Sequence, residues 1–158
     1  MSYSHSSQDL HIVPCFTPVD TGAVTAASDV IDAGECTHVQ FLIYFGALDV
    51  AGVFNVYEAT DAAAGTSVQT FAYTYRYSAV TGTDLMGAVT VPAAVDLAYA
   101  GTEDGMILVV DIEPAKLTAG YPYVWVEINP TAGANNTLAI IALVTPRYSQ
   151  DIVPSVVD

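Results

Sequence analysis

The stretch that decides the fold is VQFLIYF, residues 39–45, a run of apolar residues rich in aromatic and β-branched side chains. This composition is typical of a β-strand. A turn over 46–52 and a second apolar run over 53–59 follow it, which predicts a hairpin with a loop longer than the tight two-residue type. Because VQFLIYF is apolar at both alternating sets of positions, we expect a central strand that is covered on both faces.

Further runs of the same kind occur on both sides of this stretch. They are HIVPCF (11–16, closed by Thr17 and Pro18), QTFAYTYRY (69–77), MILVVDIE (106–113), YVWVEIN (123–129) and LAIIALV (138–144). No long run shows a helical period, and prolines fall between the runs, where a missing N–H does no harm. About eight strands at a spacing of about 8–12 residues predict an all-β fold, an antiparallel β-sandwich that is jelly-roll-like.

The length of the chain, 158 residues, predicts one domain. We expect a mobile N-terminal arm over 1–9, a single β-sandwich domain over 10–148 and a flexible or extended C-terminal arm over 149–158. The N-terminus has no basic start and no apolar stretch, so we expect no signal peptide. The longest apolar run, 138–144, is far shorter than the roughly 20 residues that a spanning helix needs.

Charge is scarce and one-sided. Only Arg76, Lys116 and Arg147 are basic, against seventeen acidic residues, which gives a net charge of −14. Three scattered cations exclude binding to nucleic acid or to an anionic membrane surface. Charged residues make up 13% of the chain, about half the usual share, while 53% of its residues are hydrophobic. We therefore expect part of the surface to be hidden against identical neighbours, in a homo-oligomer.

Residues able to carry catalysis are few and scattered. His5 falls in the expected arm, whereas His11 and His38 lie near Cys15 and Cys36 in sequence. A Cys–His pair is conceivable, but no glycine-rich nucleophile turn surrounds either cysteine. Two cysteines are too few for a disulfide framework and lack metal-ligand spacing, so we expect buried thiols. Four carboxylates lie within or at the ends of strong strands, at positions that usually face solvent: Glu58, Asp111, Glu113 and Glu127. We expect neither an enzyme nor a bound cofactor.

Two groups of acids are close together in sequence. Asp29, Asp32 and Glu35 form one, and Glu103 with Asp104 forms the other. Either group could hold Ca²⁺ loosely, although neither has the spacing of a calcium-binding loop. Solvated loop acids are the alternative interpretation and the one we favour, so we predict no metal site.

A row of aromatic residues provides the candidate interface. Tyrosine and tryptophan combine an apolar ring with a polar tip, which suits protein interfaces and sugars alike. The row either forms one wall of the core together with Phe71 or lies exposed as an interface. With two apolar residues of the C-terminal arm, the interface candidates are Tyr73, Tyr75, Tyr77, Trp125, Ile152 and Val153.

Three segments carry a family resemblance. In VDIEPAKLTAGYPYVWV (110–126) a strand ends in an acidic residue, a short turn containing leucine follows, and a Gly-Tyr step leads into a Tyr-Val strand. LAIIALVTPRY (138–148) ends on Pro-Arg-Tyr, and VIDAGECTHVQFLIYF (30–45) has an acidic turn before its long strand. Together they cover roughly half of the chain, and they resemble small virion structural proteins of tailed phages, of the capsid decoration (cement) type.

The resemblance implies a β-rich domain that binds the outside of a phage head. Such proteins are often trimers, and they clamp adjoining subunits of the major capsid protein against the pressure of the packaged DNA. The implied location is the virion, after synthesis in the host cytoplasm, and no active-site residues are carried over. The chain departs from the pattern in its very low Lys and Arg count.

Three other functions compete with this one. A tail or adhesin module would bind host glycans through the tyrosine row and Trp125. An enzyme on a jelly-roll scaffold would need a pocket with a perturbed histidine or carboxylate. A structural tail protein, such as a tube or tail-completion subunit, has the same composition as a head protein.

Overall fold

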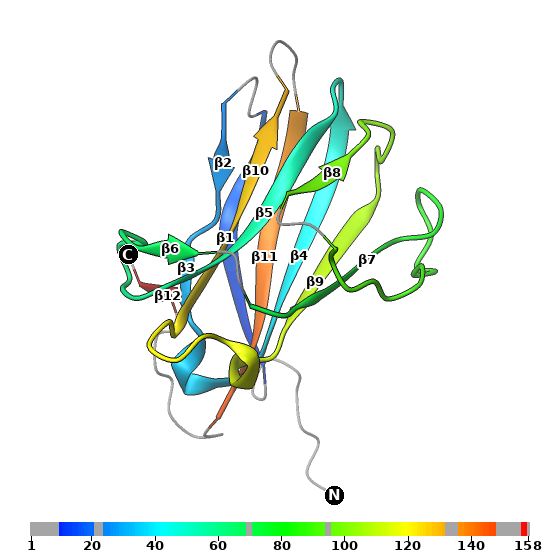
Figure 1. Cartoon of the computed structure of the whole chain (residues 1–158). Coiled ribbons are helices and arrows are strands. Elements are labelled where there is room, and N and C mark those ends of the chain that lie inside the picture. The colour runs from blue at the N-terminus through cyan, green and yellow to red at the C-terminus, as the bar shows by residue number, and fades with distance from the viewer. Residues whose placement is uncertain are drawn as a thin grey trace, which may run out of the picture.

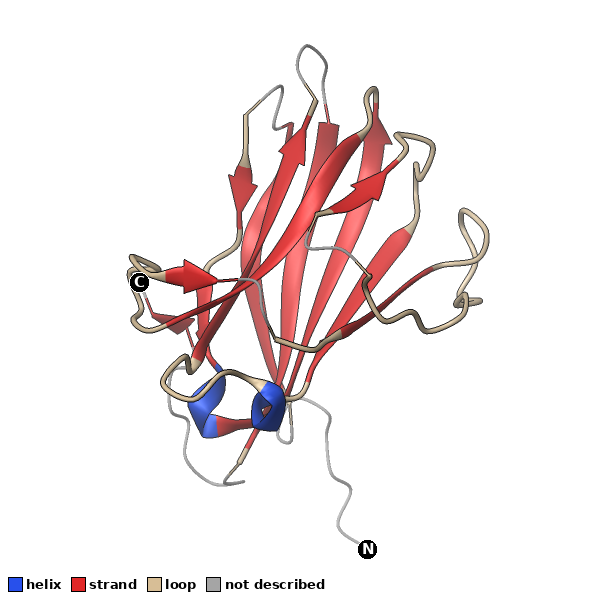
Figure 2. Ribbon diagram, in the orientation of Figure 1, coloured by secondary structure: helices blue, strands red, loops and turns tan. Residues whose placement is uncertain are grey.

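The computed structural model describes residues 10–20, 24–68, 71–93, 96–131, 136–147 and 156–157. These residues form two antiparallel sheets that pack face to face, so the predicted all-β sandwich is confirmed (Figures 1 and 2). Within the same ranges, helical structure is confined to two short 3₁₀ turns, Ala33–Glu35 and Pro114–Lys116, at one end of the sandwich. No helix in the described part of the chain has the length and apolar character needed to cross a bilayer.

The first sheet, called the β4 sheet below, consists of the longest strands. Its order is β1 (His11–Asp20), β11 (Asn136–Pro146), β4 (Cys36–Leu48), β9 (Ile107–Ile112) and β7 (Thr74–Tyr77). β4 occupies the centre and pairs with β11 on one side and with β9 on the other. The prediction that 39–45 forms a central strand is therefore confirmed.

The second sheet, called the β5 sheet, lies against the first. Its order is β12 (Val156–Val157), β3 (Val30–Asp32), β10 (Tyr123–Pro130), β5 (Gly52–Ala59) and β6 (Ser67–Val68), while β2 (Ala26–Ala27) also pairs with β10 and β8 (Leu97–Tyr99) with β5. β1, β3, β4 and β5 alternate between the sheets along the chain, and so do β9, β10 and β11 (Figure 1). The predicted hairpin of 39–45 with 53–59 is therefore wrong, because β4 and β5 lie in different sheets and pair with other strands. Antiparallel pairing with these crossings is the topology of a jelly roll.

The core lies between the inner faces of the two sheets. On β4 the buried positions alternate, with Phe41, Ile43 and Phe45 fully inside. The intervening Leu42 is half-buried and Tyr44 is 50% exposed. The prediction that this strand is covered on both faces is therefore wrong. Its outer apolar residues lie on an open sheet face, because the described residues form only two layers and none of them builds a third layer over β4.

β1 is longer than the sequence predicts and contains prolines. The predicted run ends before Thr17 and Pro18, whereas the strand continues to Asp20. β1 is an edge strand, and its register shifts between Pro14 and Phe16 and again between Phe16 and Val19. An edge strand with bulges tolerates a missing N–H, which explains why proline does not end this strand.

The predicted arms lie almost wholly outside the described residues. Nothing of 1–9 is described, and within 149–158 only β12 is. β12 pairs antiparallel with β3, with Val156 opposite Ile31 and Val157 opposite Val30. The chain therefore returns to the edge of the β5 sheet after leaving the β4 sheet at Pro146.

Candidate functional site

The outer face of the β4 sheet is apolar across four adjacent strands. Every second residue of a strand faces the same side of its sheet, so the strand register defines this face. Opposed pairs across the sheet are Ile12–Leu143, Pro14–Ile141, Ile141–Leu42, Leu42–Val109, Ala139–Tyr44 and Tyr44–Ile107. We call these nine residues the apolar face.

Several members of the apolar face are open to solvent. Ile12 is 56% exposed, Tyr44 50%, Ile141 38% and Ile107 37%. Single exposed apolar residues are ordinary, but a contiguous group on neighbouring strands marks an interaction surface. The sequence signal for this face was present in the apolar outer positions of VQFLIYF, which were interpreted as a second covered face.

Polar groups border the apolar face. Gln40 Nε2 donates a hydrogen bond of 2.5 Å to Asp111 Oδ1, and His38 Nε2 lies 3.3 Å from the same oxygen. Arg76, on β7, is opposite Val109. Its Nε is buried and has no hydrogen-bond partner among the described residues, and no carboxylate within those ranges forms an ion pair with its guanidinium. Arg76 therefore lies at the edge of the apolar face with no acidic partner among the residues that the structure describes.

The outer face of the β5 sheet has a different character. Trp125 on β10 is directly opposite Tyr57 on β5, and their rings stack with centroids 4.4 Å apart at 14°. The indole extends toward β6, where its Nε1 lies 3.4 Å from Ser67 Oγ. Sequence reasoning selected Trp125 but missed Tyr57, because the pairing of β10 with β5 cannot be read from either strand alone.

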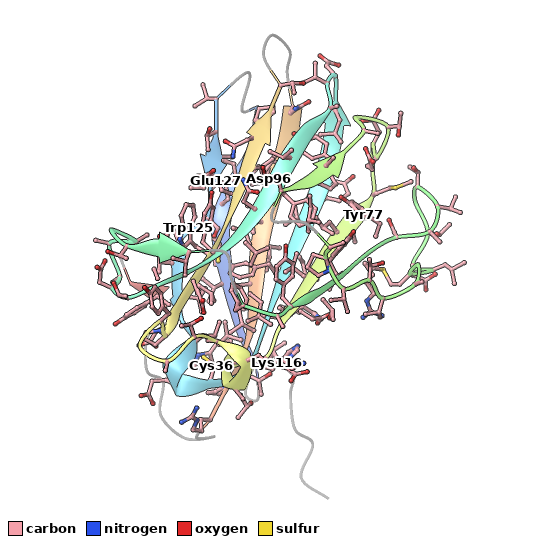
Figure 3. All side chains as sticks on the ribbon, in the orientation of Figure 1. Cys36, Tyr77, Asp96, Lys116, Trp125 and Glu127 are labelled. Carbon is pink, nitrogen blue, oxygen red and sulfur yellow. The ribbon has the colours of Figure 1, made fainter. Side chains whose placement is uncertain are left out.

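A row of hydrogen bonds continues from this ring pair along β10. Asn129 Nδ2 donates to Glu127 Oε1 at 2.6 Å, the Tyr57 hydroxyl lies 3.5 Å from the same oxygen, and Thr25 Oγ1 donates to Asn129 Oδ1 at 2.5 Å. Asp96, in the segment before β8, lies in the same region (Figure 3). We call Tyr57, Trp125, Glu127 and Asn129 the polar-aromatic face.

The Tyr57 hydroxyl stays protonated at neutral pH. Burial raises the pKa of Tyr57, and the negative charges of Glu127 and Asp96 raise that pKa further. The polar-aromatic face therefore holds a neutral phenol, which donates to Glu127 Oε1, beside carboxylate and amide oxygens.

The tyrosine row of the candidate interface lies on the inner side of β7. Tyr73 is 7% exposed, and Tyr75 and Tyr77 pack against the core. Tyr75 meets Phe54 edge to face at 5.8 Å, and Tyr77 stacks on Phe45 at 6.4 Å. The sequence left open whether this row forms one wall of the core or lies exposed as an interface. These contacts are those of a core wall.

The remaining interface candidates are not brought together with this row. Trp125 lies on the outer face of the opposite sheet, and Ile152 and Val153 lie outside the described residues. Burial raises the pKa of Tyr73 and of Tyr77, whose hydroxyls are buried and have no hydrogen-bond partner within the described ranges. These hydroxyls therefore remain neutral inside the sandwich.

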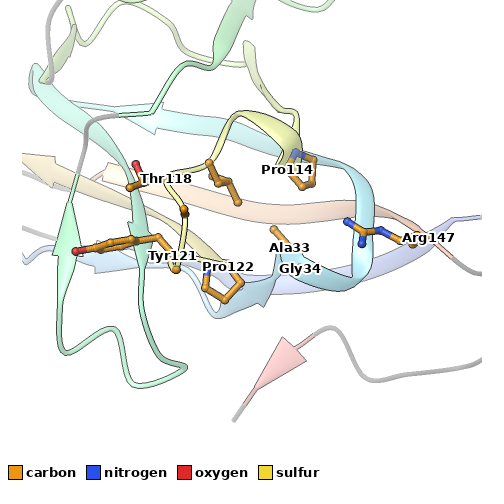
Figure 4. Close-up of a pocket in the computed structure, with 10 residues that line it drawn as sticks. Ala33, Gly34, Pro114, Thr118, Tyr121, Pro122 and Arg147 are labelled. Carbon is orange, nitrogen blue, oxygen red and sulfur yellow. The ribbon is translucent and has the colours of Figure 1, made fainter.

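A pocket of about 280 Å³ opens at the end of the sandwich that holds the 3₁₀ turns (Figure 4). Arg147 stands on one side of it, and Thr118 and Tyr121 stand on the other. Its lining contains no carboxylate, imidazole or thiol among the residues that the structure describes. Its lining residues are Ala33, Gly34, Pro114, Leu117, Thr118, Ala119, Gly120, Tyr121, Pro122 and Arg147.

The two cysteines are buried free thiols, as predicted. Burial raises the pKa of Cys15 to about 12 and that of Cys36 to about 11. Cys36 Sγ donates to the Asp32 carbonyl at 3.1 Å, whereas His38 is paired with Asp111 on the outer face. Cys36 and His38 therefore do not form a nucleophile and base.

The two acidic groups serve loop structure. Asp32 accepts from Gly34 N at 2.9 Å, Glu103 accepts from Ala100 N and Thr102 N, and Asp104 accepts from Leu48 N at 2.7 Å. No group of three or more His, Cys, Asp or Glu residues in the described ranges could hold a metal ion.

Comparisons of the chain with protein families, with curated proteins and with solved structures find no match.

Proposed function

We propose that this protein is a non-enzymatic structural subunit of a tailed-phage virion, a capsid decoration protein that works as a homo-oligomer, most simply a trimer. The apolar face carries this proposal. Ile12, Tyr44 and Ile141 expose aliphatic and aromatic surface on three adjacent strands. Burying such a surface against neighbouring molecules stabilises an assembly by about 25 cal/mol for each Å² removed from water.

Charge supports identical copies as the neighbours. The core of a protein interface is depleted in charge, as the apolar face is. A second copy also brings a large excess of carboxylates, seventeen in each chain. One of these could pair with Arg76, which has no acidic partner in its own chain among the described residues. Closed cyclic symmetry would then cover the apolar face on every copy.

The resemblance of 30–45, 110–126 and 138–148 to decoration proteins supports the location on a phage head. A rigid two-layer jelly roll suits a clamp, because its packed core resists deformation when neighbouring capsid subunits move. The major capsid protein is the second partner in this proposal. It would contact a surface of the oligomer that the copies leave open.

Light scattering on the purified protein tests the assembly. We expect the wild-type chain to have the mass of a trimer at micromolar concentration, and the Tyr44→Lys/Ile141→Lys variant to be a monomer. The control is Val80→Lys/Val89→Lys, which adds the same charges at two exposed valines between β7 and β8, outside the apolar face. A monomeric wild-type chain, or a double variant of the apolar face that remains trimeric, would contradict the proposal.

Binding to heads tests the location. Expanded heads of the phage that encodes the chain, stripped of decoration, are incubated with the protein and sedimented. We expect saturable co-sedimentation of the wild-type chain and ordered density at threefold or quasi-threefold positions by electron microscopy. Density in the tail together with bare heads would contradict the head location and would instead identify the protein as a structural subunit of the tail.

A further inference from the structure

We propose that the polar-aromatic face binds a neutral saccharide. This inference goes beyond the proposed function, because it uses the outer face of the β5 sheet, on the opposite side of the sandwich from the apolar face. Trp125, Tyr57 and Glu127 carry it, and they come from two adjacent strands in the middle of that sheet.

The ring pair supplies an apolar platform. One face of the Trp125 indole is covered by Tyr57, and within the described residues no other ring packs on Trp125. Sugar rings have an apolar side formed by axial C–H groups, and this side stacks on aromatic faces in the way that other apolar groups do. Tyr57 beneath the indole fixes its orientation, so little side-chain entropy is lost when a ligand stacks on it.

Carboxylate, amide and phenol groups lie next to the platform at hydrogen-bonding spacing. Glu127 Oε1 accepts from Asn129 at 2.6 Å, and the Tyr57 hydroxyl lies 3.5 Å from the same oxygen. A carboxylate oxygen accepts a hydroxyl hydrogen strongly, and adjacent sugar hydroxyls both donate and accept. The Tyr57 hydroxyl donates to Glu127 Oε1 and so helps to fix this carboxylate beside the platform. An aromatic ring beside a few convergent polar groups is the ordinary composition of a small-ligand site.

Electrostatics select the class of saccharide. Glu127 and Asp96 both place negative charge at this face, and the chain carries −14 overall. A sialylated or uronic acid chain would bring like charges together, which costs free energy at short range. The ligand class is therefore a neutral oligosaccharide.

The test uses a reporter that the chain already contains, because Trp125 is its only tryptophan. Neutral glucan, mannan and galactan hexasaccharides are titrated in turn while tryptophan emission is recorded. We expect a saturable shift with at least one of them and none with sialyllactose or a galacturonate hexamer. No saturable shift with any neutral hexasaccharide overturns the proposal, as does a response to the anionic sugars alone.

Substitutions on the polar-aromatic face test whether the saccharide binds there. We expect Trp125→Ala to abolish binding measured by calorimetry, and Glu127→Gln to weaken it about tenfold or more, through loss of a charge-assisted hydrogen bond. Glu113→Gln is the matched control, since it removes the same charge from a carboxylate outside this face that pairs with Lys116. Thermal melts confirm that each variant is folded. Binding that survives both Trp125→Ala and Glu127→Gln overturns the assignment. Assembly is measured separately by light scattering, so failure here is distinguishable from failure of the proposed oligomer.

Discussion

The buried carboxylate of Glu58 holds Thr118 through two hydrogen bonds. The Thr118 backbone N–H donates to Oε2 at 2.7 Å, and its hydroxyl donates to Oε1 at 2.5 Å. Glu58 is fully buried near the end of β5, 60 residues away along the chain. A buried carboxylate is tolerated only with donors of this kind, so the loop that enters β10 is fastened to the β5 sheet. That loop also forms a wall of the pocket beside Arg147.

Replacing Glu58 by Ala should destabilise the protein by about 1–3 kcal/mol, because it removes the acceptor of two hydrogen bonds, each contributing about 0.5–1.5 kcal/mol. Thr118→Val, which removes only the hydroxyl, should cost less. Urea unfolding followed by circular dichroism gives the free energy of unfolding for each variant. The exposed Glu113→Gln is the control and should be neutral. An equal effect of Glu58→Ala and Glu113→Gln would show that the loop is held by other contacts.

Gly52, at the start of β5, should tolerate no side chain. An added Cβ would lie 2.6 Å from the Asn129 carbonyl oxygen and against the Tyr99 ring, and the backbone carbonyl of a paired strand cannot move away. We expect Gly52→Ala to lower the free energy of unfolding by about 1–3 kcal/mol. Gly65→Ala is the matched control, because its Cβ would meet only the Asp61 carboxylate at 3.7 Å. Equal melting temperatures of the two variants would contradict this expectation.

The alternation of apolar and polar residues predicted correctly which face of a strand is buried when the other face is polar. It failed to predict burial where the outer face is apolar as well. In β10 the buried Val124, Val126 and Ile128 alternate with half-buried residues, so the inner face could be read from the sequence. In β4 the pattern of Leu42 and Tyr44 was interpreted as two covered faces. An apolar outer position looks the same in sequence whether a further layer of the same chain or another molecule covers it, and only the topology distinguishes the two.

The candidate sites depended on relationships across strands, which the sequence does not contain. Trp125 was recognisable as an unusual outer residue, but its stacking partner Tyr57 is 68 positions away and becomes its neighbour only through the register of β5 with β10. The tyrosines of β7 alternated as predicted. Whether Tyr75 and Tyr77 faced inward depended on how β7 joins the sheet beside β9, which places their rings against Phe54 and Phe45.

Salt should strengthen the proposed oligomer. Each copy carries −14, so assembly brings like charges together. These charges act over about 30 Å at about 0.01 M salt and over about 8 Å at about 0.15 M. Sedimentation velocity should therefore show dissociation at the lower salt concentration and trimers at the higher one. Arg76→Gln should dissociate more readily at both, since it removes an attractive cation at the edge of the apolar face. Tighter assembly at low salt would mean that pairing with the few cations outweighs the net repulsion.

Alkaline pH should destabilise the protein through its two thiols. In the unfolded chain both have a pKa near 9.0, whereas burial raises the pKa to about 12 for Cys15 and to about 11 for Cys36 in the folded chain. Above pH 9 the unfolded state therefore binds fewer protons than the folded state, and the free energy of unfolding falls as pH rises. The contribution is fully present below pH 9 and is lost progressively as pH rises through 9 toward 11 and 12.

Urea unfolding from pH 8 to pH 10 measures this slope. The Cys15→Ala/Cys36→Ala variant should have a shallower slope than the wild-type chain, with the buried tyrosines left as the remaining cause. Iodoacetamide gives an independent readout, because only the thiolate reacts. At pH 8.5 both thiols should be modified at least tenfold more slowly in the folded protein than in urea. Equal modification rates in the two states would show that the thiols are accessible, and the account of their raised pKa would then be wrong.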